Sequence, residues 1–218
     1  MSLGAIQIFA ISIIPVLLAI TVHEASHGYA AKYFGDKTAY FLGRITLNPL
    51  KHIDPVGTIL IPGSLLLLAY VQGTTPFLFG WAKPVPVNFS NLNNPKKDMM
   101  WVAFAGPGSN LVMAIIWAIV LGFFQSPGNS YGVFINGMAQ VGIMINLILM
   151  LLNLLPIPPL DGGRMAVSVL PSPWSYKLAS IEKYGMFIII FLFISEFLSA
   201  ILRPLLSFFQ GLLTGIFV

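Results

Sequence analysis

The sequence predicts an all-α polytopic membrane protein, a bundle of about four to six transmembrane helices in one domain over residues 1–218. Of the 218 residues, 57% are hydrophobic and only 8% are charged, whereas about 25% of the residues of a soluble globular domain are charged. Several apolar stretches reach the roughly 20 residues that cross a bilayer. Short polar loops separate them, which leaves no room for a large soluble domain.

The elements can be placed in order along the chain. Alternating residues near 40–47 and 83–87 predict small membrane-associated β-strands. Gly35 is a typical C-cap for the first helix. The predicted spans cover residues 3–34, 99–124, 133–155 and 186–202, and residues 204–218 form a short apolar tail.

The apolar segment 56–80 is interrupted at Pro62-Gly63 and near Gly73, so it either crosses the membrane or re-enters it. Re-entry requires that protein, not lipid, surrounds the freed backbone groups. With re-entry, almost all basic residues lie on one side, which the positive-inside rule makes cytoplasmic, and Arg203 is the exception. The basic residues are scattered through several polar loops, so the net charge of +4 does not indicate a nucleic-acid partner. The residues on that side are Lys32, Lys37, Arg44, Lys51, Lys83, Lys96, Lys97, Arg164, Lys177 and Lys183.

The sequence HEASH places His23, Glu24 and His27 inside the first span, where ionisable groups are costly and usually functional. Residues four apart share one face of a helix, so two imidazoles can bind one ion, with Glu24 beside them as a base. Zinc suits histidine and carboxylate ligands, and the chain has no cysteine. The alternative is a pair of core histidines satisfied by neighbouring helices.

A third ligand is expected at a break in a helix. In NLLPIPPLDGGR three prolines remove backbone donors and two glycines permit close approach, so the helix opens there. Asp161 at this break could meet a metal ion. Alternatively, it caps the helix that resumes at Arg164.

The other acidic residues have simpler explanations. Asp36 and Asp98 lie at span ends, where capping or snorkelling explains them. Glu182 is expected to be solvated. Glu196 could form a structural pair with Arg203, and this is left open.

His52 and Asp54 in KHIDP allow two interpretations. They could form a gating or secondary polar site near the catalytic residues. The favoured interpretation is an Asp-Pro turn beside a solvated histidine.

Three motifs in this order, HEASH, AGPGSN and NLLPIPPLDGGR, resemble the site-2 protease family of intramembrane zinc metalloproteases over about residues 22–164. GRITLNPLKHIDPVGT and GWAKPVPVN resemble its compact bacterial subgroup without PDZ domains. The resemblance implies one catalytic zinc ion, Zn2+, a general base, and two asparagines at the substrate site. These residues would be His23, His27 and Asp161 for zinc, Glu24 for the base, and Asn153 and Asn110 for substrate binding.

The resemblance also implies a catalytic core over about residues 3–170, followed by C-terminal helices over about 174–218. Its substrates would be single-pass transmembrane proteins, cut within or near their helices in regulated intramembrane proteolysis and clamped by the β elements. The enzyme would sit in the lipid bilayer of the bacterial inner membrane, open to the cytoplasm, and could form a homo-oligomer. Two other functions compete: a metal-binding transporter or channel, which also uses broken helices, and a binding module, which needs no general base.

Overall fold

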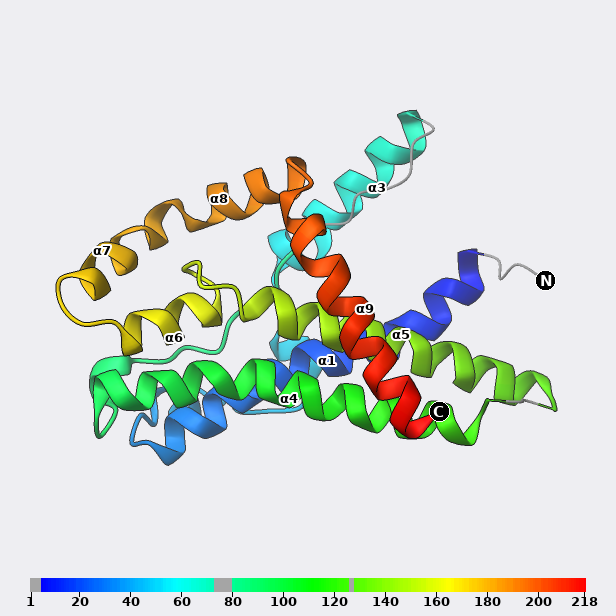
Figure 1. Ribbon diagram of the computed structural model, residues 1–218, viewed down its shortest axis with the longest axis horizontal. Helices are drawn as coiled ribbons and strands as arrows, with labels where there is room; N and C mark the ends of the chain where they lie inside the picture. The colour runs from blue at the N-terminus through cyan, green and yellow to red at the C-terminus, as the bar shows by residue number, and fades with distance from the viewer. Residues whose placement is uncertain (1–4, 73–79, 126–127) are drawn as a thin grey trace.

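The computed structural model describes residues 5–72, 80–125 and 128–218, and every regular element among them is a helix (Figure 1). Three long helices form the body of the bundle, and each packs against the other two. A fourth long helix, α9 (Phe197–Phe217), crosses α4 and α5 and contacts both. The three helices of the body are α1 (Ala5–Tyr33), α4 (Pro95–Phe123) and α5 (Ser130–Asn153).

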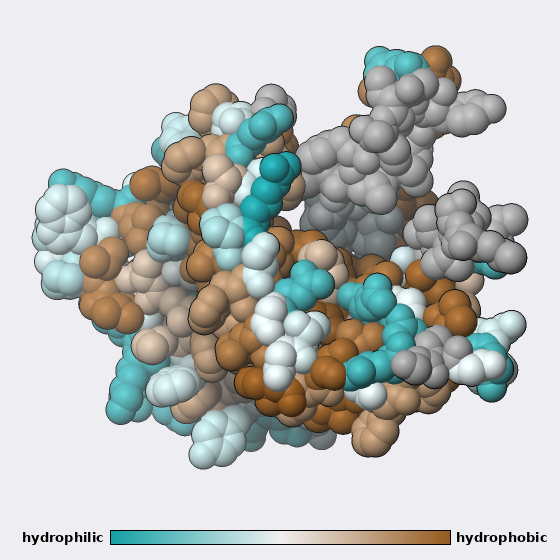
Figure 2. All heavy atoms as spheres, turned by 45° about the vertical axis from the view of Figure 1, so that its right-hand side comes forward, coloured by the Kyte–Doolittle hydropathy of each residue, from teal (hydrophilic) through white to brown (hydrophobic). Residues whose placement is uncertain are grey.

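Four helices in the described part of the chain are long and apolar enough to cross a membrane. This number lies within the predicted range, and the all-α prediction is confirmed for these residues. Figure 2 shows apolar side chains over much of the lower centre of one face, as expected for helices that face lipid. The four candidate spans are Ala10–Tyr33, Pro95–Phe123, Ser130–Asn153 and Phe197–Phe217.

Small residues bring the long helices close together. Ala114 and Ala118 on α4 and Ala139 on α5 are completely buried. In lipid, helices associate mainly through close van der Waals packing, which such small side chains permit. Larger side chains fill the space around them, from Ile143 and Leu147 on α5 to Leu198, Leu202 and Leu213 on α9.

The predicted boundary of the last span is wrong. Instead of a span over 186–202 and a short tail, α8 (Glu182–Ile194) ends early and α9 continues through Pro204. The chain turns at Glu196, which has a positive φ of 59°. The apolar residues on both sides of Ser195-Glu196 look alike, so composition does not reveal the turn. Among the described residues, Glu196 forms no ion pair with Arg203.

The predicted β-strands are absent from the described residues. A short helix, α2 (Thr38–Phe41), occupies part of the first candidate. Residues 81–88, which we call the strap, have no regular secondary structure and pair with no strand among the described residues. Pro84 and Pro86 explain this, because proline fixes φ and has no N–H to donate to a ladder.

The segment with the Pro62-Gly63 interruption forms two helical pieces, the turn η2 (Pro55–Leu60) and α3 (Ile61–Gln72). Helix α3 continues directly from η2, and Pro62, its second residue, has no N–H to donate. Helix α3 contacts η2 and projects away from the bundle (Figure 1). Re-entry of segment 56–80 stays a prediction, because residues 73–79 lie outside the described residues.

A non-helical stretch separates α5 from α6 (Asp161–Val169). The start of α6 packs so closely on this stretch that a Cβ on Gly162 would meet the backbone of Leu154, and one on Gly163 that of Pro158. Helix α6 also packs on α4 and on α7, which fixes where its first residue lies. The remaining elements are η1 (Pro49–Lys51), η3 (Phe89–Asn91) and α7 (Trp174–Ser180).

Candidate metal centre

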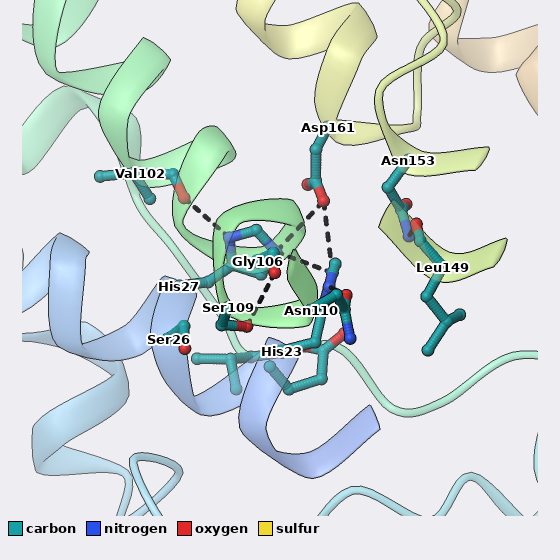
Figure 3. A network of polar contacts seen from close by, with 12 residues as sticks. His23, Ser26, His27, Val102, Gly106, Ser109, Asn110, Leu149, Asn153 and Asp161 are labelled. Atoms are coloured by element: carbon teal, nitrogen blue, oxygen red, sulfur yellow. Dashed lines mark hydrogen bonds and ion pairs between the residues drawn. The ribbon is translucent and has the colours of Figure 1, made fainter. Parts of the chain in front are cut away.

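Three side chains from two helices converge at one point. His23 and His27 lie one turn apart on α1, and Asp161 is the first residue of α6 (Figure 3). Asp161 Oδ2 is 3.3 Å from the Nε2 atom of each histidine, and the two Nε2 atoms are 3.1 Å apart. One possible ligand atom from each residue lies within 4.8 Å of the other two. The structure therefore brings together the three predicted metal ligands.

Hydrogen bonds decide which nitrogen of each ring carries the proton. His27 Nδ1 lies 2.7 Å from the carbonyl oxygen of Val102, which can only accept, so Nδ1 donates. His23 Nδ1 lies 2.6 Å from Asn110 Oδ1. The amide nitrogen of Asn110 donates to Ala19 O and Asn146 Oδ1, so its oxygen is the atom that faces His23. In both neutral rings, Nε2 is therefore the bare nitrogen.

Two bare nitrogens and one carboxylate oxygen consequently face a common point. Asp161 Oδ2 is buried and has no hydrogen-bond partner. Facing lone pairs repel one another unless a cation or a proton lies between them. Two imidazole nitrogens and one carboxylate oxygen suit zinc and leave its fourth position open, as in catalytic sites.

Gly106 of α4 forms the floor of this cluster. A Cβ on Gly106 would collide with His27 Nε2 and come within 2.6 Å of His23 Cε1. Glycine is therefore required by the close approach of α4 to the two imidazole rings.

Asp161 is held as a carboxylate. Burial by itself would raise its pKa, but when an imidazole of His23 or His27 carries a proton toward Oδ2, the hydrogen bond and the positive charge outweigh burial and lower the pKa well below the ordinary value. The carboxylate also stands at the N-terminus of α6, where the helix dipole favours negative charge. Asp161 is thus ready to bind a cation at neutral pH.

Glu24 lies beside the cluster in a cavity of about 150 Å³. Its Oε2 atom accepts a hydrogen bond of 2.7 Å from the backbone N–H of Val85 in the strap. Asn153 and Arg164 line the same cavity, and the amide of Asn153 donates to Leu149 O. The cavity therefore holds a carboxylate next to the three candidate metal ligands, which is the arrangement needed to activate a water molecule.

Asn110 takes a different place from Asn153. It is completely buried behind His23 and is not among the described residues that line the cavity. Its side-chain amide bonds to His23, Ala19 and Asn146, which leaves it no free group for a substrate.

His52 and Asp54 lie outside the described cavity lining. Asp54 accepts hydrogen bonds from Val56 N and Gly57 N and so caps η2, as a turn residue does. The prediction that His52 is solvated is wrong, because its side chain is buried and its Nε2 bonds to Thr46 O.

The remaining acidic residues serve local structure. Asp98 accepts from the backbone N–H of Asn94 and caps α4. Glu182, expected to be solvated, forms a half-exposed ion pair of 3.6 Å with Arg164. Asp36 is fully buried and accepts hydrogen bonds from Thr38 and Asn88.

Sequence reasoning missed several groups that complete the site. Asn146, alone in an apolar run of α5, carried a usable signal, because a lone amide in a membrane helix needs a partner. The carbonyl of Val102 and the N–H of Val85 are backbone groups, and the residue type does not predict which backbone groups face a site. Gly106 lies within the AGPGSN motif, but the sequence does not predict that it packs against the two histidines.

The family model described as "Peptidase family M50" matches the chain over residues 11–135 and 128–195. The chain is 39% identical over 199 residues to "Putative zinc metalloprotease YwhC" of Bacillus subtilis, covering 89% of this chain and 85% of that protein. It is 28% identical over 200 residues to "Putative zinc metalloprotease Rip2" of Mycolicibacterium smegmatis, covering 90% and 71%. No solved structure gives a significant match.

Proposed function

The chain belongs to peptidase family M50 and is an integral membrane zinc metalloprotease, and we propose that it hydrolyses peptide bonds within or near transmembrane helices of other membrane proteins. One observation supports this most. His23, Glu24 and His27 all lie inside α1, a helix long and apolar enough to cross a membrane. A peptide bond cut there is one that lies at membrane depth.

His23, His27 and Asp161 would hold the zinc ion. Bound zinc supplies a Lewis acid and lowers the pKa of water toward about 7. Glu24 takes the proton of the attacking water and delivers it to the leaving amine. Hydrogen bonds to Asn110 and Val102 keep the two imidazoles in the tautomer that this chemistry needs.

The substrate would lie along the cavity wall. Asn153 reaches this wall with a side-chain amide, which supports a role in holding the backbone of an unwound substrate. Asn110 would act through His23 rather than on the substrate. A helix keeps its carbonyls in internal hydrogen bonds, so the segment to be cut must unwind first. Single-pass proteins are the simplest substrates, because one helix can enter from the lipid.

We place the enzyme in the bacterial inner membrane, with the site open to the cytoplasm. The positions of the basic residues support this orientation if segment 56–80 re-enters the membrane. Helices η2 and α3 form one uninterrupted run of 6 and 12 residues, which is shorter than the roughly 20 residues that cross a bilayer and so supports re-entry.

Cleavage of a panel of tagged single-pass membrane proteins in detergent tests the function. Wild type is compared with Glu24→Gln, and zinc is measured in each preparation. The proposal expects zinc in both and cleavage inside the spanning segment by wild type only. Glu196→Gln, which removes an exposed carboxylate in the turn before α9, is the matched control and should cut like wild type.

Two outcomes would contradict the proposal. Cleavage by Glu24→Gln at the wild-type rate would remove the assigned base. Transport of zinc into vesicles by the wild type, without cleavage of any protein in the panel, would favour the metal-transporter alternative.

A further inference from the structure

The carboxylate of Glu24 is bound by a segment far away in the sequence. Val85 N–H donates to Glu24 Oε2 at 2.7 Å, across 61 residues. Among the described residues no other hydrogen bond reaches Glu24, and its Oε1 atom is free of them. We propose that Val85 is a positioning residue, whose backbone N–H holds the general base in its working orientation. The proposal rests on the function given above.

The strap that carries this N–H is fixed along its length. Lys83 N donates to His52 O at 2.9 Å, and Asn88 N donates to Asp36 Oδ2 at 2.7 Å. Arg44 Nη2 donates to the carbonyl oxygens of Lys83 and Pro84 at 3.0 and 3.2 Å. These bonds lie on both sides of Val85, so its N–H has a defined position.

The two prolines leave one donor at the right place. Pro84 and Pro86 have no N–H, so Val85 alone can donate from residues 84–86. Both prolines also favour an extended backbone at the residue before them. The sequence KPVPVN therefore presents a single donor to Glu24 from a stiff segment.

The side chain of Val85 fits against α1 one turn beyond Glu24. It is 7% exposed and lies over Gly28, where an added Cβ would be 3.2 Å from Val85 Cγ1 and 2.9 Å from Ile45 Cγ1. Because Gly28 has no side chain, the strap can approach the helix closely enough for the N–H of Val85 to reach the carboxylate.

The consequence for catalysis is an oriented base. A glutamate side chain has several rotatable bonds, and helix α1 offers no donor that restrains this one. With Oε2 held by Val85, Oε1 remains for the proton of the attacking water. Orientation of a reacting group lowers the barrier of the step in which it takes part.

The hydrogen bond can be observed without any turnover. Pairing carbonyl-13C proline with 15N-valine restricts the NMR spectrum to valines that follow proline, here Val16, Val56, Val85 and Val87. In the zinc-loaded full chain, Glu24→Gln should shift the amide proton of Val85 upfield and leave Val16 in place. Glu196→Gln is the control and should shift neither. An unmoved Val85 signal in Glu24→Gln would overturn the proposal, whether or not the protein proves to be a protease.

The catalytic role is tested by replacing the amide of residue 85 with an ester, which keeps the valine side chain and removes the N–H. A hydrogen bond to a charged group predicts a fall in kcat of about 10- to 100-fold. KM should change less than about threefold, and the zinc content should equal that of wild type. Unchanged kcat, or a rise in KM alone, would overturn the proposal, because a residue that only lines the cavity acts on substrate binding.

A double change separates positioning from general damage to the fold. Glu24→Asp shortens the side chain, so its carboxylate no longer reaches Val85. In that background the ester should lower kcat by less than about twofold. Losses that multiply would show that Val85 acts independently of residue 24 and would overturn the proposal.

Discussion

The Nε2 atoms of His23 and His27 lie 3.1 Å apart, and the Nδ1 atom of each ring is engaged elsewhere, with Asn110 and with Val102. This arrangement places two lone pairs against each other inside a helix bundle. The fold keeps it in place through hydrogen bonds that do not involve a metal ion. Asn110 and Val102 therefore help to orient the two rings, and the groups around the site can be tested one at a time.

Asn110→Leu removes the acceptor that fixes the tautomer of His23. We expect zinc affinity to fall about 10- to 100-fold, the usual effect of losing such a partner of a metal-binding histidine. Competition with a chromogenic chelator measures the change. Asn136→Leu removes an amide that bonds to Phe124 O, away from the cluster, and should keep wild-type affinity. Equal affinities in both variants would contradict the role of Asn110.

Gly106→Ala should abolish zinc binding, because the new methyl group would occupy the space of the imidazole rings. Gly108→Ala is a matched control two residues further along α4, where the added Cβ meets the ring of Phe104 at 3.2 Å. Alanine also favours the helix by about 1 kcal/mol at either position. Zinc content after purification checks the pair. Zinc retained in Gly106→Ala would show that α4 is not the floor of the site.

The parts of this site that sequence predicted are those that depend on local geometry. His23, Glu24 and His27 share one helix, so their spacing alone places them together. The place of Asp161 at the end of a non-helical stretch was also predictable, because prolines and glycines in NLLPIPPLDGGR indicate a break in the helix. The strap could not be described correctly as a strand, since a strand needs a partner elsewhere in the chain, and KPVPVN has none among the described residues.

Helix boundaries in the C-terminal part failed for a related reason. Residues on the lipid side and on the protein side of a membrane helix are both apolar, so the periodicity that marks helix faces in water is weak. In the sequence, the turn at Glu196 is therefore marked only by two polar residues, Ser195 and Glu196, between two apolar stretches. Asn146, which completes the network behind His23, shows that lone polar residues in such helices are the more useful signal.

Removal of zinc should destabilise the protein. Without a cation, Asp161 Oδ2 lacks a hydrogen-bond partner and the two Nε2 atoms face each other. A ligand present at 100 times its Kd stabilises the folded state by about 2.7 kcal/mol. We expect chelation to lower the Tm in detergent, and excess zinc to restore it. Chelation should leave the Tm of Gly106→Ala unchanged, and an equal drop in that variant would mean that the metal acts elsewhere.

Asp36 should make stability depend on pH in the acid range. Burial opposes its ionisation, but hydrogen bonds from Thr38, Asn88 and Asn91 outweigh burial and lower the pKa of the carboxyl below the ordinary value of 3.8. A group whose pKa is lowered by folding contributes stability above its unfolded pKa. That contribution is lost as the pH falls through the lower folded pKa.

Asp36→Asn should therefore lower stability at pH 7 by about 1.5–3 kcal/mol, the range for hydrogen bonds to a charged group. In wild type, Thr38 N and Asn88 N donate to different oxygens of Asp36. In the variant, the NH2 group of the side-chain amide must face one of these two donors, which adds to the loss. Thermal unfolding of chelated wild type and variant, from pH 7 to pH 3, measures the difference without a contribution from zinc. The two Tm values should converge as the pH falls below about 4, where the carboxylate of the unfolded chain becomes protonated. A gap that stays constant over this range would mean that Asp36 contributes through shape rather than through its charge.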